Sequence, residues 1–396
     1  MSLAPVLAAL LGLLCLTTAS AAPYVPASDA QIVETLRERP LDATDRAARR
    51  LRQEARRQPR NLALALAAAR DAIGLARRDG DPRQLGLAQA ALAPWWALAE
   101  PPPAVLLLRA TVLQSQHAFA AALADLDRLL ADPATPLALR AQAELTRASL
   151  LQVQGRYAEA AAGCERLASA RYFSLGAGAA WIAEVCSAEL RSLQGHARQA
   201  KTELVKLADR AVSPDQVAWL ALVRAELAGR MADDADAQAL YRQALAASGR
   251  PDVYLLGSYA DWLLDHGRAS EAASLLAGRE AADALLLRLA LAYQSARDPR
   301  AAGAIATLRE RFEAAKLRGD ALHRREEARM RLQLLGEPQR ALSLATENWG
   351  LQKEPADTRL LLEAAAAANQ ASAAQPVLRF IRETGYVDAR LARWLP

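Results

Sequence analysis

The sequence lacks the short motifs on which common enzyme and metal sites are built. It has no G-x-x-x-x-G-K phosphate loop, no H-E-x-x-H zinc motif, no G-x-S-x-G nucleophile turn and no C-x-x-C pair. Only three cysteines and four histidines occur in 396 residues. Gly176-Ala177-Gly178 starts like a dinucleotide loop, but no strand-like segment precedes it and the third glycine is missing. We therefore expect no enzyme activity, no cofactor and no metal site.

Strand patterns are missing as well. β-branched residues are sparse, and no segment alternates valine, isoleucine or threonine with polar residues. Aromatic residues make up 5% of the chain, whereas hydrophobic residues reach 53%, most of them alanine and leucine. Alanine and leucine both favour helices, so the composition predicts an all-α protein.

Lysine is scarce, since only four of the 49 basic residues are lysine. Arginines gather in one predicted helix over residues 42–58, whose only large apolar residue is Leu51. Such a helix can dock on an anionic membrane surface or an acidic partner, although we favour a solvated helix face. The basic surface candidates are Arg49, Arg52 and Arg56. No aromatic residues interleave them for base stacking, so we expect no nucleic-acid partner.

Residues 1–21 have the features of a secretory signal peptide. Leu3–Leu16 is an uncharged apolar run, shorter than the roughly 20 residues of a membrane span. Thr17–Ala21 ends in a small-residue cleavage pattern. No lysine or arginine precedes the run, which leaves an uncleaved N-terminal anchor as the alternative. We expect cleavage after Ala21, a short leader over residues 22–27, and a mature protein that is periplasmic or secreted.

Cys164 and Cys186 are the two cysteines of the mature chain. In an oxidising compartment such a pair can form a disulfide. The two residues lie at unequal distances from a predicted turn at 170–173, which places their Cα atoms outside the range of roughly 4.4–6.8 Å that a bridge requires. We therefore favour two small buried packing residues and keep the disulfide as the alternative.

A turn followed by alanine recurs with a period of about 35 residues, which is typical of a helical-repeat solenoid. Gly155–Ala160 reads GRYAEA, Gly195–Ala200 reads GHARQA and Gly267–Ala272 reads GRASEA. We expect a divergent helix pair over residues 28–59, about nine helix pairs over 60–385, and a capping helix in 386–396. No low-complexity linker interrupts the array, so the mature chain is predicted to be one domain.

The period and its small residues resemble the tetratricopeptide-repeat family. Leu286, Leu289, Ala290 and Tyr293 on one predicted helix, with Ala302 on the next, match the family's pattern of large and small residues. With its predicted signal peptide the chain resembles an exported bacterial member, and the resemblance implies a right-handed superhelical solenoid of antiparallel helix pairs. It implies further that the first helix of each pair lines a concave face, on which family members bind peptides or partner domains.

By this resemblance, polar and large side chains on the first helices are the candidates for partner binding. They are Gln114, Gln152, Trp219, Glu226, Tyr254, Asp261, Gln294, Met330 and Gln333. Glutamines along a groove can hydrogen-bond an extended peptide, although a solvated helix face explains the same residues and is the interpretation that we favour. No lysine falls on this face, so the basic set with which some members clamp chaperone carboxylates is not matched.

The predicted function is an exported scaffold that binds a peptide or partner domain on its concave face. This prediction rests on the resemblance, because one fold serves many functions. Two alternatives stay open. One is a membrane-associated assembly or secretion accessory that docks through the basic helix, and the other is a binding or regulatory subunit of an envelope enzyme.

Overall fold

A computed structural model describes residues 28, 43–317 and 323–395. The predicted signal peptide, the leader and the first helix of the opening pair lie outside the described residues. The chain divides into two compact units, Met1–Arg46 and Ala47–Pro396. Nearly all of the described residues belong to the second unit, which contains the helical array.

The helices pair along the chain as the sequence predicts, and no described residue lies in a β-strand. The first described helix is α2 (Ala43–Arg57). The pairs that follow are α3 (Leu62–Asp79) with α4 (Arg83–Trp96), α5 (Pro103–Ser115) with α6 (Phe119–Ala131), α7 (Leu137–Val153) with α8 (Tyr157–Leu167), α9 (Ala177–Leu193) with α10 (Ala197–Ala208), α11 (Pro214–Arg230) with α12 (Asp234–Ala247), α13 (Val253–Asp265) with α14 (Ala269–Leu276), α15 (Asp283–Ser295) with α16 (Arg300–Leu317), α17 (Arg324–Gln333) with α18 (Pro338–Trp349), and α19 (Pro355–Ala367) with α20 (Gln375–Thr384). Within the described part of the chain, the short 3₁₀ helices are η1 (Ala170–Leu175), η2 (Ala371–Ala374) and η3 (Ala389–Trp394). The protein is thus an all-α solenoid of helix pairs.

The repeated glycine of the sequence is a turn residue in the left-handed conformation. Gly155, Gly195 and Gly267 have φ angles of 73°, 84° and 68°, which glycine adopts without the steric cost of a Cβ. In other pairs a residue with a side chain takes the same conformation at this point. His117, Ala232, Arg297 and Asn369 have φ angles between 54° and 58°. The tight turn between the two helices is therefore kept even where the sequence has no glycine.

The first helices of neighbouring pairs contact one another and form an inner layer. Alanines of this layer lie where helices pack closely, and Ala188, Ala225, Ala260 and Ala290 are each 0% exposed. A small side chain lets two helix backbones approach, while leucines fill the space between pairs. The core is accordingly a series of clusters along the solenoid instead of one centre.

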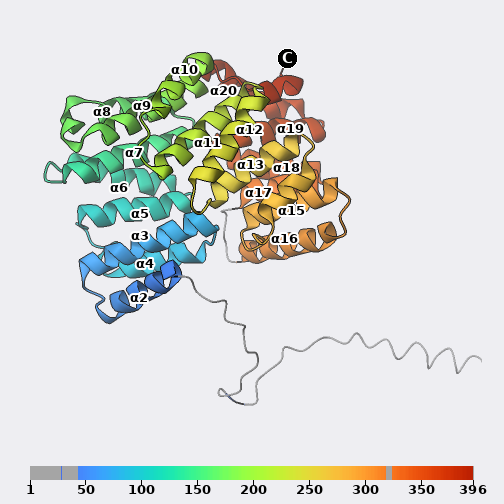
Figure 1. The fold of residues 1–396 in the computed structure, drawn as a ribbon. Coiled ribbons are helices and arrows are strands. Elements are labelled where there is room, and N and C mark those ends of the chain that lie inside the picture. The colour runs from blue at the N-terminus through green and yellow to red at the C-terminus, as the bar shows by residue number, and fades with distance from the viewer. Residues whose placement is uncertain (1–27, 29–42, 318–322, 396) are drawn as a thin grey trace, which may run out of the picture. The chain divides into compact units, whose positions relative to one another are not determined.

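Pairs far apart in the sequence also touch. The Lys353 amide donates a 2.7 Å hydrogen bond to the Val153 carbonyl, which joins the loop before α19 to the end of α7. A Cβ added at Gly195 would lie 2.9 Å from the carbonyl oxygen of Gly385, so the turn after α9 lies against the end of α20. Figure 1 shows α20 beside α9 and α10. The inner layer therefore surrounds a cavity instead of lining a long open groove.

Two connections differ from the sequence prediction. α4 continues through Pro94 to Trp96, although proline rules place its end near Leu92. Pro94 lies in the last turn, where little of the helix follows. The predicted turn at 170–173 is part of the 3₁₀ helix η1, in which Tyr172 is 3% exposed.

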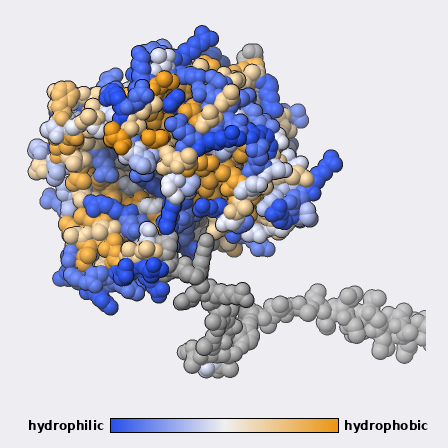
Figure 2. All heavy atoms as spheres, in the orientation of Figure 1, coloured by the Kyte–Doolittle hydropathy of each residue, from blue (hydrophilic) through white to orange (hydrophobic). Residues whose placement is uncertain are grey.

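Figure 2 shows hydrophilic residues over most of the visible face, with hydrophobic residues in separate groups. Among the described residues, no helix combines the length and the hydropathy needed to cross a membrane.

Candidate binding cavity

The inner layer surrounds a cavity of about 690 Å³. Its lining comes from the first helix of every pair from α3 to α19, with further residues from α8, α12, η3 and the turns. Eight Asp or Glu and seven Arg side chains are among the lining residues, so the charge is dense and nearly balanced. No three His, Cys, Asp or Glu side chains of the described chain are placed to hold a metal ion.

Part of the cavity wall carries carboxylates that arginine neutralises. Asp261 of α13 accepts hydrogen bonds from Arg288 of α15 and, at 2.6 Å, from Arg329 of α17. Arg288 is held in turn by the backbone carbonyls of Gly257, at 3.1 Å, and Ala284, at 2.8 Å. Burial raises the pKa of Asp261, but the two guanidinium groups outweigh it and lower the pKa to about 2.

Further ion pairs extend this wall toward α19. Asp265 of α13 pairs with Arg359 of α19. Gln333 of α17 donates from Nε2 to a Glu363 oxygen of α19 at 3.2 Å. The neighbouring inner helices α13, α15, α17 and α19 are thus joined by polar contacts across the cavity wall. The arginine side is defined as Asp261 and Asp265 with their partners Arg288, Arg329 and Arg359.

The adjoining helices α9 and α11 carry two cavity carboxylates that arginine does not neutralise. No described lysine or arginine forms an ion pair with Glu189 of α9 or Glu226 of α11. Gln152 Nε2 donates to Glu189 at 2.7 Å, and Ser258 Oγ donates to Glu226 at 2.9 Å. The acid side is defined as Glu189 and Glu226.

Burial raises the pKa of both carboxyl groups of the acid side. The positive charge of Arg230 lowers both pKa values, but by less than burial raises them. Arg230 is only 6% exposed, and its Nη2 donates to Ser192 Oγ at 2.8 Å. One arginine therefore faces two carboxyl groups, and the acid side carries excess negative charge when both are ionised.

Two aromatic residues of α13 also line the cavity. Tyr254 is 56% exposed, and the negative charge of Glu226 raises the pKa of its hydroxyl. Trp262 is 8% exposed, and its Nε1–H has no hydrogen-bond acceptor among the described residues. Buried donors without an acceptor are rare in folded proteins, so this N–H can serve an acceptor atom of a ligand.

Glu189, Glu226 and Asp261 occupy the same position in three successive pairs. Each lies six residues before the left-handed residue of its turn and directly after a buried alanine of its helix. Glu226 and Asp261 are among the residues predicted for the concave face, whereas Glu189 is not. The common spacing from the turn is the sequence signal that finds it. Arg288 and Arg329 had no such signal, because an arginine on a helix face is recognised as a cavity residue only once its partner is placed.

Five of the nine residues predicted for partner binding line the cavity. They are Gln152, Glu226, Tyr254, Asp261 and Gln333. All five belong to inner helices, the first helices of their pairs. Four of the five, all except Tyr254, make a hydrogen bond to a neighbouring inner helix, so this part of the wall is already organised without a ligand.

The other four candidates do not line the cavity. Gln114 is half-buried and Gln294 is exposed outside it. Trp219 is half-buried, and its ring meets the Trp181 ring edge-on with centroids 5.6 Å apart. Met330 was predicted to lie on the concave face. It is instead 1% exposed and packs in the core with residues of α15 and α16, so a ligand cannot reach it. The adjacent Arg329 faces the cavity in its place.

Cys164 of α8 and Cys186 of α9 are joined by a disulfide, with their Cα atoms 5.9 Å apart. This distance corrects the expectation of two unbridged cysteines. The two cysteines are separated from the connection by different numbers of residues, but this does not keep them apart. The connection is the 3₁₀ helix η1, which packs along α9 and accommodates the extra residues.

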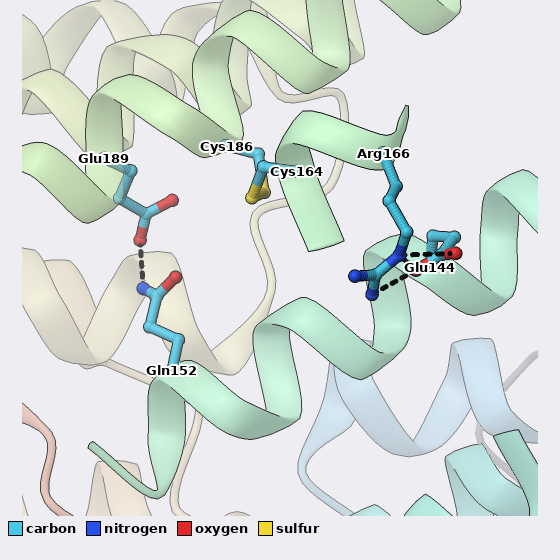
Figure 3. The surroundings of a disulfide bond; sticks show 6 residues. All are labelled: Glu144, Gln152, Cys164, Arg166, Cys186 and Glu189. Atoms are coloured by element: carbon cyan, nitrogen blue, oxygen red, sulfur yellow. Dashed lines mark hydrogen bonds and ion pairs between the residues drawn. A yellow bond between two sulfur atoms is a disulfide. The ribbon is translucent and has the colours of Figure 1, made fainter. Parts of the chain in front are cut away.

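Figure 3 shows the disulfide between two polar contacts of α7. On one flank Gln152 bonds Glu189 of α9, and on the other Glu144 forms a 2.9 Å ion pair with Arg166 of α8. The bridge and these contacts together fix α9, which carries Glu189, to the preceding pair.

The basic helix α2 lies apart from the cavity lining. Arg49 and Arg56 are exposed, whereas Arg52 is half-buried and forms a 3.5 Å ion pair with Asp71 of α3. Arg52 therefore contributes to packing α2 against α3, and it is not the free surface charge that the sequence suggested.

No protein-family model matches the chain, and no curated protein does either. Similar solved structures include a Rap protein complexed with Competence and Sporulation Factor, with 16% identity over 89% of this chain and 94% of that chain and a TM-score of 0.45. Another is the APC/C hetero-tetramer Cut9–Hcn1, with 15% identity over 87% and 73% and a TM-score of 0.39. Similarity at this level identifies neither a partner nor an activity. By its own repeat length, paired helices and buried alanines, the chain is an all-α solenoid of tetratricopeptide-like repeats.

Proposed function

We propose that the chain is an exported scaffold that binds a short peptide segment of a partner protein inside its cavity. The observation that carries the proposal is the convergence of polar and aromatic side chains from all the inner helices on one cavity. Its volume of about 690 Å³ lies within the range of roughly 300–1,000 Å³ that is common for ligand pockets. A wall that is hydrogen-bonded beforehand loses little entropy when a segment binds.

Two observations support export. The predicted signal peptide at residues 1–21 would carry the chain out of the cytoplasm. The Cys164–Cys186 disulfide is a bond that persists mainly in oxidising compartments such as the bacterial periplasm. Immunodetection of the tagged chain in periplasmic and cytoplasmic fractions checks this part of the proposal, and a cytoplasmic chain of unchanged length would refute it.

Site-specific photocrosslinking tests the position of the partner. A benzophenone amino acid replaces Tyr254 in the cavity or, as the matched control, Phe173, which is 69% exposed and does not line the cavity. We expect a discrete protein adduct from position 254 in cells that express the full chain, and none from position 173. Adducts from position 173 alone would place the partner on the outer surface and contradict the proposal.

Docking on a membrane through α2 is the second candidate, because Arg49 and Arg56 are both exposed. Their replacement by glutamate should release the chain from vesicles that contain anionic lipid, if this candidate holds. Under the scaffold proposal the same substitutions leave the adduct at position 254 unchanged.

A further inference from the structure

We propose that the acid side of the cavity binds a lysine or arginine side chain of the peptide segment, so that the scaffold selects basic segments. This inference rests on the proposed function, because it requires that a peptide enters the cavity. It assigns the acid side, Glu189 and Glu226, as the subsite that sets the specificity.

The first step is the difference in charge between the two walls. Asp261 has two guanidinium partners, whereas Glu189 and Glu226 have none among the described residues. A ligand cation would give the acid side the ion pairs that the arginine side already makes within the protein. An anionic side chain would instead meet two carboxyl groups and Arg230, the arginine that acts on the pKa of both and whose Nη2 is already bonded to Ser192.

The second step is the fixed direction of the carboxyl groups. Gln152 and Ser258 donate to Glu189 and Glu226, and each donor comes from an adjacent inner helix. Ser258 Oγ also lies 2.9 Å from the Tyr241 hydroxyl. The oxygens are therefore held in place before a ligand arrives, and charge-assisted hydrogen bonds are strongest when their geometry is set in advance.

The third step is the surroundings of the carboxyl groups, which suit a peptide. Tyr254 lines the same cavity and is 56% exposed, and the negative charge of Glu226 raises the pKa of its hydroxyl, so a cation near Glu226 can also contact the aromatic ring. Trp262 lines the same cavity with an Nε1–H that has no acceptor among the described residues and is 8% exposed. A peptide carbonyl would satisfy this donor, whereas a simple amine or metal cation has no acceptor to offer it.

The test is selection from a display library of random hexapeptides whose N-termini are blocked by fusion, so that only side chains supply cations. The targets are the mature wild-type chain, the Glu189→Gln/Glu226→Gln double variant, and the Glu184→Gln control. Glu184 lies on α9 as well, but it pairs with Arg210 at 2.6 Å and does not line the cavity.

We expect the wild type and the control to select peptides with lysine or arginine at one fixed position, and the double variant to lose that preference. A selected lysine peptide should bind the double variant roughly tenfold or more weakly than the wild type. Replacing its lysine by norleucine, which removes only the charge, should weaken wild-type binding by a similar factor. The norleucine comparison uses the unaltered protein, so it holds even if a variant folds poorly.

The outcomes separate this inference from the proposed function. Selection of peptides without a basic preference, or an unchanged preference in the folded double variant, overturns the inference and leaves peptide binding in the cavity intact. Failure of the wild type to select any peptide overturns the proposed function, and the inference falls with it.

Discussion

The arginine side and the acid side are two regions of one cavity that begin from the same repeat position. Asp261 and Glu226 each follow a buried alanine and precede the turn by six residues. Asp261 meets two arginines, and its pKa falls to about 2, whereas burial raises the pKa of Glu226. The repeat therefore sets where a carboxyl group lies, and the neighbouring pairs set its charge state. One repeated sequence pattern thus gives both the arginine side, whose carboxylates are paired within the protein, and the acid side, which we propose to bind a ligand.

The largest effect is expected from the disulfide, which supports only the acid side. Replacing Cys164 and Cys186 by serine removes the cross-link of a loop with a sequence separation of 22. The free energy of unfolding should fall by roughly 2–4 kcal/mol, because the unfolded chain is no longer restrained. Chemical denaturation measures the change. Reduced wild type serves as the control and should match the variant; an unchanged midpoint would show that the bridge does not restrain the chain.

Removing the central charge of the arginine side should have the next largest effect. Asp261→Asn leaves Arg288 and Arg329, which are 15% and 18% exposed, without their carboxylate. We expect a loss of about 1–3 kcal/mol in the free energy of unfolding at neutral pH, since partial exposure reduces the cost of a broken buried pair. The exposed Asp209 supplies the control Asp209→Asn, for which we expect almost no change.

The same variant predicts a pH dependence. The folded-state pKa of Asp261 is about 2, below the usual value of about 3.9 in the unfolded chain. The ion pairs thus stabilise the wild type above about pH 4, and this contribution is lost as the pH falls toward 2. Asp261→Asn should lack this part of the acid destabilisation. Equal slopes of stability against pH for both proteins would contradict the assignment.

A test of packing should give the same result on both sides. Ala260 and Ala225 are 0% exposed and precede Asp261 and Glu226. Leucine at either position overpacks the inner layer, and each substitution should cost about 1–3 kcal/mol in thermal unfolding experiments. The exposed Ala121 of α6 provides the control Ala121→Leu. If one side tolerates leucine and the other does not, the two walls differ in packing as well as in charge.

The smallest stability change is expected from Glu189→Gln with Glu226→Gln. Glutamine keeps the shape and the hydrogen bonds, and burial already disfavours the ionised carboxyls, so stability at pH 7 should stay within about 1 kcal/mol of the wild type. A loss as large as that of Asp261→Asn would show that the acid side is structural.

The sign of the pH effect is opposite to that of Asp261. Both pKa values are raised in the folded state, so these groups favour folding below their unfolded pKa, and that contribution is lost as the pH rises through the folded pKa. The charges that act on both groups are Arg230, which lowers their pKa values, and Glu354, which raises them. The double variant should lose this dependence in unfolding curves recorded at several pH values, and binding of a basic peptide should strengthen as the carboxyls ionise.

The fold was predictable to a large extent because its signals are local. Gly155, Gly195 and Gly267 of the repeated turn all adopt the left-handed conformation that favours glycine. The helix ends and turns that differed from the prediction depend on packing against neighbouring elements or on the position of a proline within the last turn. Pro94 is tolerated at the end of α4, and η1 replaces a simple turn because it packs against α9.

The cavity was predictable only in part. Gln152 and Gln333 were found because the resemblance identifies the inner face of each pair. Met330 was placed on that face although it packs in the core at 1% exposure. A turn that lies one residue later or earlier in a pair rotates the helix face by about 100°, so residue spacing alone cannot fix which neighbour faces the cavity.

The sequence by itself determined the all-α class and the period of the repeat, because each depends on contacts within a pair or between adjacent pairs. Only the tertiary structure decided that Lys353 meets Val153, that Gly385 lies against Gly195, and that the inner layer surrounds a cavity. These contacts join residues almost 200 positions apart and follow from the accumulated rotation of many pairs. The low pKa of Asp261 depends on contacts between pairs too, since it is set by Arg288 and Arg329 from the two following pairs.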